Sequence, residues 1–343
     1  MSQSSKLRKA VNLALQGGGS HGAFTWGVLD CLLQDDRVDI EGISGTSAGA
    51  INAVVLVDGF MQGGIDGARQ ALHDFWKAVS DEARASPIQR SPLNMLTGDW
   101  SLDNSPGYLW FDLVSRMASP YEMNPLNMNP LRDLLERQVD FERIHHCELI
   151  KLFVSATNVH TGRVRVFSCG EISVDAVLAS ACLPHMLQAV EIDGVPYWDG
   201  GYMGNPVLFP FFDACETEDV VIVQINPIER KDTPKTARDI IDRVNEITFN
   251  SSLLKEFRAI DFVSRLIEDG KLDPAHYKQI RVHRIEGNEF LNPLGASSKL
   301  NTEWAFLQHL FEAGRDTANV WIEGTFDALG KHSSMDLRAM FQG

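Results

Sequence analysis

Ser47 is the residue of this chain whose surroundings most resemble those of an enzyme nucleophile. It lies in IEGISGTSAGAIN, residues 40–52, between Gly45 and Gly49 in a G-x-S-x-G pattern. A short apolar run precedes the serine and a helix-like segment follows it, as in the strand–turn–helix elbow that exposes a reactive hydroxyl. The pattern predicts attack by Ser47 on an acyl carbonyl, a reaction that also needs a base and a site for the oxyanion.

A glycine-rich segment near the N-terminus fits two different functions. In LALQGGGSHGAF, residues 13–24, Gly17, Gly19 and Gly22 have the G-x-G-x-x-G spacing of a dinucleotide-binding turn. Glycine N–H groups ahead of a helix would equally well bind the oxyanion of an acyl transfer. A dinucleotide site needs an acid about twenty residues later to bind the ribose. Glu41 has that spacing but lies at the start of the serine elbow, which favours the oxyanion site and leaves dinucleotide binding as the alternative.

The candidate base is Asp199, in EIDGVPYWDGG, residues 191–201. An Asp-Gly pair in this segment predicts a hairpin turn, and Gly200 and Gly201 follow the aspartate. Taken alone, D-G-G is more typical of a turn without chemical function. Serine hydrolases normally use histidine, but none of the 10 histidines lies in a distinctive motif. We therefore expect His160, His185 and the others to be surface or packing residues.

Composition and charge narrow the class of protein. The 343 residues are 44% hydrophobic and 22% charged, a globular profile that is long enough for one large α/β domain with an extension. The 31 Lys and Arg against 46 Asp and Glu give a net charge of −15, and no block of like charges occurs. This argues against a nucleic-acid partner and against strong attraction to anionic lipid. Any contact with a membrane would therefore be apolar.

Cysteine usage and the absence of targeting patterns suggest a compartment. The 5 cysteines are odd in number, far apart and mostly within apolar runs, as expected of reduced thiols in a core. The first apolar run is too short for a signal peptide, and no run approaches the length of a transmembrane helix. No H-E-x-x-H motif or clustered Cys and His spacing predicts a metal. We expect a cytoplasmic protein, peripheral to a membrane at most, with no metal and no cofactor.

Strand-like and helix-like segments alternate along the chain. Apolar runs predict strands at residues 10–15, 38–43, 149–158, 164–169 and 220–226, with a weaker candidate at 278–285. Helical spacing or composition occurs at 22–34, 48–57, 64–79, 130–138, 204–214, 234–269 (one or two helices) and 299–329. This order predicts an α/β fold with a mainly parallel central sheet flanked by helices.

Residues 86–130 interrupt the alternation. This insertion is dense in Pro, Asn and Met and carries several aromatic residues, including Trp100 and Trp110. Such a long connection is uncommon unless it is functional or disordered, and the aromatic content argues against disorder. Two interpretations are equally favoured: a lid or wall of an acyl-chain pocket, and an irregular satellite core packed on the sheet.

In this order, the three motifs resemble those of the patatin-like phospholipase family. That family has a G-G-G-x-[KR]-G loop, a G-x-S-x-G elbow and an aspartate in D-G-G or D-G-A. The chain supplies them as Gly17, Gly18, Gly19 and Gly22, then Ser47 with Gly45 and Gly49, then Asp199 with Gly200 and Gly201. The segment ASACLP, residues 179–184, is similar to the family's A-S-x-x-x-P. His21 departs from the pattern, because the family usually has Lys or Arg there.

The resemblance implies a three-layer fold related to the α/β hydrolases. It makes residues 10–215 the catalytic domain and 216–343 a largely helical C-terminal extension with two strand candidates, packed on the core. It implies a Ser47–Asp199 catalytic dyad without histidine, and an oxyanion hole formed by Gly17, Gly18 and Gly19. The expected activity is hydrolysis of lipid carboxylic esters, of the phospholipase A, lysophospholipase or lipid esterase type. The expected partner is therefore a lipid ester, with weak peripheral contact to a lipid surface; a catalytically inactive lipid-binding module is a further alternative.

Overall fold

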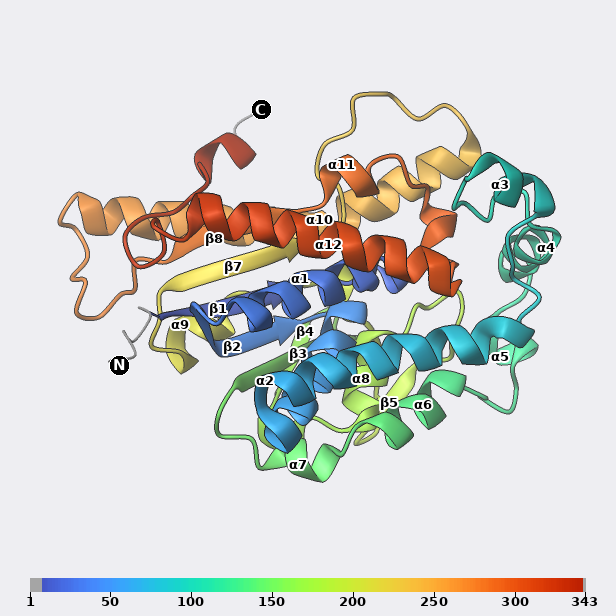
Figure 1. Cartoon of the computed structure of the whole chain (residues 1–343), viewed down its shortest axis with the longest axis horizontal. Helices are drawn as coiled ribbons and strands as arrows, with labels where there is room; N and C mark the ends of the chain where they lie inside the picture. Colours follow the sequence, from blue (N-terminus) through green and yellow to red (C-terminus); the bar gives the residue numbers. More distant parts are fainter. Residues whose placement is uncertain (1–7, 342–343) are drawn as a thin grey trace, which may run out of the picture.

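The computed structural model describes residues 8–341, in which eight strands form one sheet of order β5-β6-β3-β2-β1-β7-β8, with β4 paired to β3 (Figure 1). The strands are β1 (Lys9–Leu15), β2 (Val38–Gly45), β3 (Lys151–Asn158), β4 (Val164–Ser168), β5 (Val190–Ile192), β6 (Val195–Asp199), β7 (Asp219–Gln224) and β8 (Arg281–Glu286). All the expected strands are present, and the weak candidate at 278–285 corresponds to β8.

The centre of the sheet is parallel, as predicted. Strands β3, β2, β1, β7 and β8 run in one direction, whereas β4, β5 and β6 are antiparallel to their neighbours. Every residue of β7, DVVIVQ, is buried, which is typical of a parallel strand covered on both faces. The β5–β6 hairpin turns at Asp193 and Gly194, whose φ angles of 51° and 76° fit the tight turn that the Asp-Gly pair predicts.

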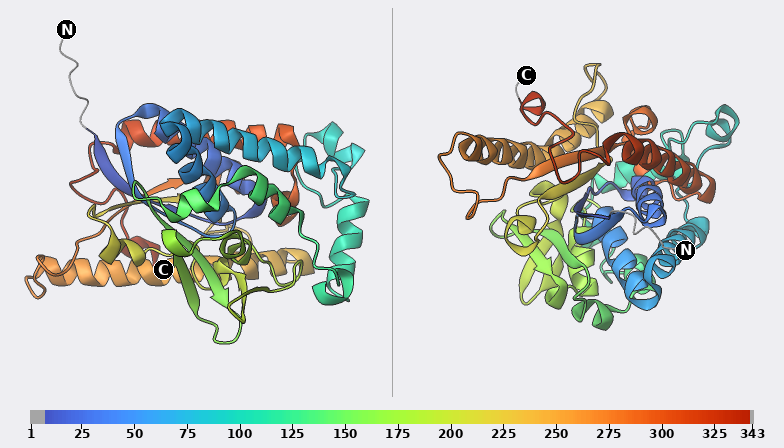
Figure 2. Two further views of the ribbon diagram at one scale, coloured as in Figure 1. Left: turned by 90° about the horizontal axis from the view of Figure 1, so that it is seen from below. Right: turned by 60° about the vertical axis from the view of Figure 1, so that its left-hand side comes forward.

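Helices cover both faces of the sheet, giving three layers (Figure 2). The helices are α1 (Gly22–Asp35), α2 (Ala48–Glu82), α3 (Pro92–Thr97), α4 (Pro106–Ser115), α5 (Pro120–Met123), α6 (Pro130–Gln138), α7 (Phe141–His145), α8 (Val174–Ser180), α9 (Pro210–Ala214), α10 (Ala237–Glu268), α11 (Asn288–Leu291) and α12 (Trp304–Thr325). Alternate residues of β1 separate the two cores. Leu13 and Leu15 pack with α1, α2 and α12, whereas Ala14 packs with α10.

Some helix boundaries differ from the prediction. Residues 48–57 and 64–79 belong to the single helix α2, which is kinked where Gly63 and Gly64 leave helical geometry. Residues 237–268 of the segment 234–269 form one long helix, and only 210–214 of the segment 204–214 are helical. The expectation about membrane-spanning length is wrong for α2, because residues 48–85 are long and apolar enough to cross a membrane. Since 67% of its most apolar window is buried in the fold, this helix has the character of a core helix.

The insertion at 86–130 contains three short helices rather than irregular chain. Each begins with a serine followed by proline at the first helical position: Ser91, Ser105 and Ser119. Serine accepts a hydrogen bond from the first turn, and proline lacks the N–H that would be unpaired there. This repeated Ser-Pro pattern is a helix-start signal that the composition of the segment obscures. The insertion lies at the end of the molecule towards which β7 runs (Figure 1).

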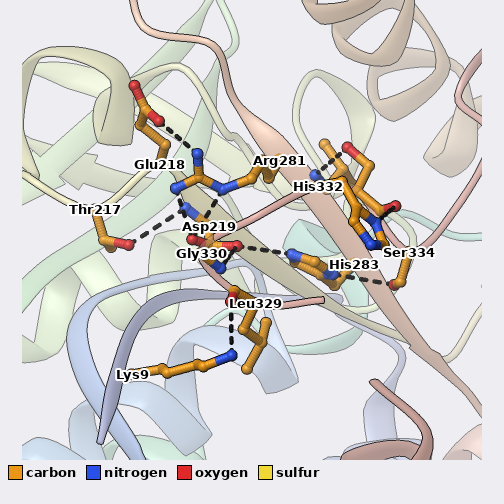
Figure 3. A network of polar contacts seen from close by, with 12 residues as sticks. Lys9, Thr217, Glu218, Asp219, Arg281, His283, Leu329, Gly330, His332 and Ser334 are labelled. Atoms are coloured by element: carbon orange, nitrogen blue, oxygen red, sulfur yellow. Dashed lines mark hydrogen bonds and ion pairs between the residues drawn. The ribbon is translucent and has the colours of Figure 1, made fainter. Parts of the chain in front are cut away.

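Within the C-terminal extension, a buried carboxylate links β7, β8 and the segment that follows α12 (Figure 3). Asp219, at the start of β7, accepts hydrogen bonds from His283 Nε2 (2.9 Å), from Arg281 Nη2 (2.9 Å) and from the Gly330 N–H (2.9 Å). The other ring nitrogen of His283 contacts Ser334 Oγ at 3.0 Å. The catalytic-domain and extension boundaries stay a prediction, since β7 and β8 of the extension continue the same sheet as β1.

We predict that Asp219→Asn destabilises the fold in a pH-dependent way. The His283 and Arg281 donors outweigh burial and lower the pKa of Asp219 from 3.8 to about 2. Because the pKa of Asp219 is lower in the folded than in the unfolded protein, its ionised carboxylate stabilises the fold at pH values above the unfolded-state pKa. This stabilisation is lost as the pH falls towards 2. The variant should lose about 2 kcal/mol of unfolding free energy at pH 7, measured by urea denaturation, and about half as much near pH 3.

Exposed Asp327 provides the matched control. Asp327→Asn should leave the urea midpoint unchanged at both pH values. An equal loss for Asp219→Asn at pH 7 and near pH 3 would contradict the electrostatic origin of the effect.

Candidate active site

Ser47 occupies a tight turn between β2 and α2. Its φ of 55° and ψ of −123° are unusual for a residue with a side chain. The neighbouring glycines make the turn possible: a Cβ atom on Gly49 would lie 2.2 Å from the Leu15 carbonyl oxygen, and one on Gly45 would lie 2.5 Å from the Gly49 oxygen. The Ser47 N–H donates to Ser180 Oγ at 2.8 Å. The side chain of Ser47 is thus held at the turn and remains partly exposed.

Asp199 ends β6, which pairs with β3 next to the elbow strand. The Ser47 hydroxyl lies near the Asp199 carboxylate and lowers its pKa, and Asp199 Oδ1 accepts the Gly201 N–H at 2.7 Å. A Cβ on Gly200 would lie 2.2 Å from the Ser155 carbonyl oxygen, so β6 ends in close contact with β3. The structure therefore brings together two residues that are 152 positions apart in the chain (199 minus 47).

Burial changes the acidity of Asp199. The residue is 2% exposed, and loss of hydration raises the pKa of its carboxyl group from 3.8 to about 6. The Gly201 N–H, the Ser47 hydroxyl and the positive charge of Lys299 oppose this rise. A carboxylate with this pKa is a better proton acceptor than an exposed aspartate and is still mostly ionised at neutral pH.

The glycine loop lies directly against the serine. A Cβ on Gly17 would be 2.6 Å from Ser47 Cβ. Both backbone polar groups of Gly17 are already bonded: its N–H donates to Asn205 Oδ1 (2.7 Å), and its carbonyl accepts from Asn226 Nδ2 (2.6 Å). The N–H groups of Gly18 and Gly19 have no partner within residues 8–341. Of the three predicted oxyanion donors, these two are therefore available to a ligand.

Gly19 and Gly22 fix the path of this loop into α1. Gly19 has a φ of 58°, and a Cβ there would lie 2.4 Å from the Lys299 carbonyl oxygen. A Cβ on Gly22 would lie 2.9 Å from Ala48 Cβ, so Gly22 permits the close contact of α1 with α2. Both positions need glycine for steric reasons.

His21 carries no positive charge in this loop. Its ring is 3% exposed, and Nε2 contacts Ser298 Oγ at 2.8 Å. Burial, together with Lys299 and Arg230, lowers the pKa of His21 well below its usual range. The position that usually carries Lys or Arg in the family pattern is therefore a neutral, buried imidazole here.

The dinucleotide alternative is not supported by Glu41. Its carboxylate accepts hydrogen bonds from Lys151 Nζ (2.9 Å), the Glu216 N–H (2.5 Å) and the Thr217 N–H (2.7 Å). These contacts tie β2 to β3 and to the start of β7. The acid expected to bind the ribose is thus used within the sheet.

His160 and His185 are both exposed, as expected of surface residues. The chain Ser334–His283–Asp219 has the residue types of a hydrolase triad (Figure 3). Asp219 lies at the start of the parallel strand β7, however, whereas Ser47 follows the end of the parallel strand β2. The His283 ring is fully buried, and the Ser334 N–H donates to the Val282 carbonyl on β8. These contacts attach the C-terminal segment to the edge strand.

Four polar residues at the site were not found from sequence: Ser180, Asn205, Asn226 and Lys299. Ser180 is the serine of ASACLP, which the sequence indicated only as a helix end. The other three are single polar residues without a motif, and only the fold brings them to the glycine loop.

Within residues 8–341, no group of three or more His, Cys, Asp or Glu side chains is arranged to hold a metal ion. All five cysteines are free, and four of them are buried.

A comparison with family models agrees with the motifs. The model of the family described as patatin-like phospholipase matches residues 13–212. Among solved structures, VipD from Legionella pneumophila is 16% identical, with a TM-score of 0.43 over 93% of this chain and 67% of that chain. ExoU, in its complex with SpcU from Pseudomonas aeruginosa, is 14% identical, with a TM-score of 0.41 over 94% of this chain and 52% of that chain. This chain therefore spans about half the length of ExoU. A comparison with curated proteins gives no significant match.

We predict that Gly49→Ala destabilises the protein by more than about 2 kcal/mol, because its methyl group would overlap the backbone of β1 at Leu15. Gly324→Ala is the control, since it lies in α12 with open space around the new methyl group. It should be neutral or stabilising by up to about 1 kcal/mol. Thermal unfolding measures both, and similar melting temperatures for the two variants would contradict the steric interpretation.

Proposed function

Because the chain belongs to the patatin-like phospholipase family, a family of lipid hydrolases, we propose that it cleaves carboxylic esters of lipids through a Ser47–Asp199 dyad. The observation that carries this proposal is the position of the Ser47 hydroxyl beside a buried carboxylate and directly beside a glycine loop. No histidine takes part in the proposed proton transfer.

The proposed reaction has two halves. Ser47 Oγ attacks the ester carbonyl carbon while Asp199 accepts the hydroxyl proton. The tetrahedral intermediate then releases the alcohol, which takes the proton back from Asp199, and leaves an acyl group on Ser47. Water attacks the acyl-serine with Asp199 again as base, and Ser47 recovers its proton as the fatty acid leaves. The raised pKa of Asp199 suits both the acceptance and the return of the proton.

We propose that Gly18 and Gly19 supply the N–H donors of the oxyanion hole. The availability of these two groups supports the assignment, whereas the bonded N–H of Gly17 argues for a positioning role of that residue. In comparable enzymes, one such donor lowers the activation barrier by about 3 to 4 kcal/mol. Gly17 is held through its N–H by Asn205 and through its carbonyl by Asn226, so the donors that follow it need little rearrangement as charge develops.

The surface beside the site supports a lipid substrate. Large apolar side chains are exposed on the insertion and on the first half of α10: Leu93, Leu96, Trp110, Met117, Leu126, Ile240 and Val244. With a net charge of −15, these apolar residues favour a neutral or zwitterionic lipid surface, contacted peripherally from the cytoplasm. The insertion would then form a wall of the acyl-chain site.

We predict that Ser47→Ala and Asp199→Asn each reduce hydrolysis of a short-chain p-nitrophenyl ester by at least about a thousandfold. Asn keeps the shape of Asp199 but cannot accept the serine proton. The double variant should be scarcely worse than either single one, because the two residues act as one unit.

Turnover should stay within about threefold of the wild type in the variants His283→Gln, His160→Gln and His185→Gln. This change is far smaller than the one expected when a general base is removed. A folded Asp199→Asn enzyme with substantial turnover, beside an inactive histidine variant, would refute the dyad. A wild-type protein that binds lipid but neither hydrolyses esters nor reacts with a fluorophosphonate at Ser47 would instead indicate an inactive lipid-binding module.

The pH dependence of kcat/KM gives an independent prediction. Because Asp199 must be ionised to act as base, activity should fall as the pH drops through its raised pKa of about 6. A pH–rate profile on a neutral ester should show a single acid limb centred near pH 6. An acid limb near pH 4 would show that the base is an exposed, unperturbed carboxylate.

A further inference from the structure

Lys299 is connected to the glycine loop by a chain of hydrogen bonds. It belongs to the 3₁₀ turn Ala296–Leu300 in the C-terminal extension, and its backbone carbonyl closely approaches Gly19. Lys299 Nζ donates to Asn226 Oδ1 at 2.8 Å, and Asn226 Nδ2 donates to the Gly17 carbonyl at 2.6 Å. The two partners fix the orientation of the Asn226 amide, since an ammonium can only donate and a carbonyl can only accept.

The Gly17 carbonyl and the Gly18 N–H belong to the same peptide group. A hydrogen bond to the carbonyl oxygen of an amide draws electron density towards oxygen and makes its N–H a stronger donor. In the same way, the hydrogen bond that Asn226 Oδ1 accepts from the Lys299 ammonium makes the Asn226 Nδ2–H group a stronger donor. Successive bonds of this kind strengthen one another, by roughly 10 to 30% per bond. The chain of contacts thus extends from the Lys299 ammonium to one of the two proposed oxyanion donors.

We propose that Lys299 is a positioning residue of the active site that acts through Asn226 and the Gly17–Gly18 peptide to strengthen the Gly18 oxyanion donor. In this role it supplies from the C-terminal extension the positive charge that neutral His21 does not provide. The inference rests on the proposed hydrolase function, because the Gly18 N–H matters for catalysis only if an oxyanion forms there.

The electrostatic surroundings of Lys299 and Asp199 define a second effect. Burial lowers the pKa of Lys299 from 10.5, and the nearby positive charge of Arg230 lowers it further. The negative charges of Glu246, Asp242 and Asp199 oppose this change. Asp199 is faced by the Gly201 N–H, the Ser47 hydroxyl and the charge of Lys299. Tyr202 and Cys182 also lie near it, and burial, together with the Asp199 charge, raises the pKa of each to about 12. Loss of the Lys299 charge should therefore raise the pKa of Asp199 further.

The first test compares Lys299→Met with Lys299→Arg and with Lys231→Met, which removes an exposed lysine from the same part of the chain. We expect Lys299→Met to lower kcat for a short-chain p-nitrophenyl ester about tenfold with KM within about twofold, because the donor is weakened rather than removed. The acid limb of the pH–rate profile of Lys299→Met should move to higher pH. Lys299→Arg should recover kcat to within about threefold of wild type, since it retains the charge and a donor. Lys231→Met should match the wild type.

The second test does not depend on turnover. In protein labelled with ¹⁵N-glycine, the Gly18 amide proton resonance should move upfield in Lys299→Met and return towards its wild-type position in Lys299→Arg. An unchanged Gly18 resonance in folded Lys299→Met, or a kcat equal to that of Lys231→Met, would overturn the proposal. If the wild-type protein hydrolyses no ester, the proposed function fails, and the Gly18 resonance still decides whether Lys299 polarises the loop.

Discussion

The contact between the ends of β1 and β2 is the constraint on which the rest of the site depends. Gly17 lies against Ser47, and Gly49 lies against the Leu15 carbonyl, with no room for a side chain at either glycine. Because the two strands are parallel neighbours, their carboxyl ends meet at the same edge of the sheet. The serine turn and the glycine loop are therefore held together by backbone contacts rather than by flexible side chains. Such rigidity is what an oxyanion site needs, because its donors must be in place before charge develops.

Asp199 reaches this edge by a different route. The sheet changes from parallel to antiparallel beyond β3, and β6 ends next to the serine turn because it runs against β3. The mixed topology thus brings a carboxylate from late in the chain to a nucleophile from its start. The same packing removes water from the carboxylate, so the fold that positions Asp199 also raises its pKa.

The parts of the structure that sequence could predict are those with a local physical signature. The buried run at 220–226, the G-x-S-x-G elbow and the Asp-Gly hairpin each contain their own structural signal within a few residues. Two other features also have signals within a few residues that were not recognised. They are the kink of α2 at Gly63 and Gly64 and the Ser-Pro helix starts of the insertion, and the composition of these segments obscured them. Asn205, Asn226 and Lys299 could not be found in this way. Each is an ordinary polar residue whose role comes from contacts between segments far apart in the chain.

The position of β7 has a consequence for any fragment of this protein. The family model ends at residue 212, yet β7 and β8 follow that point and continue the sheet from β1. A fragment ending there would leave β1 as an open edge strand, with its unpaired backbone groups and apolar side chains facing solvent. Such edges recruit other strands and favour aggregation. The shortest soluble catalytic unit should therefore include the strands contributed by the extension, and a separately produced C-terminal piece could restore solubility by pairing with β1.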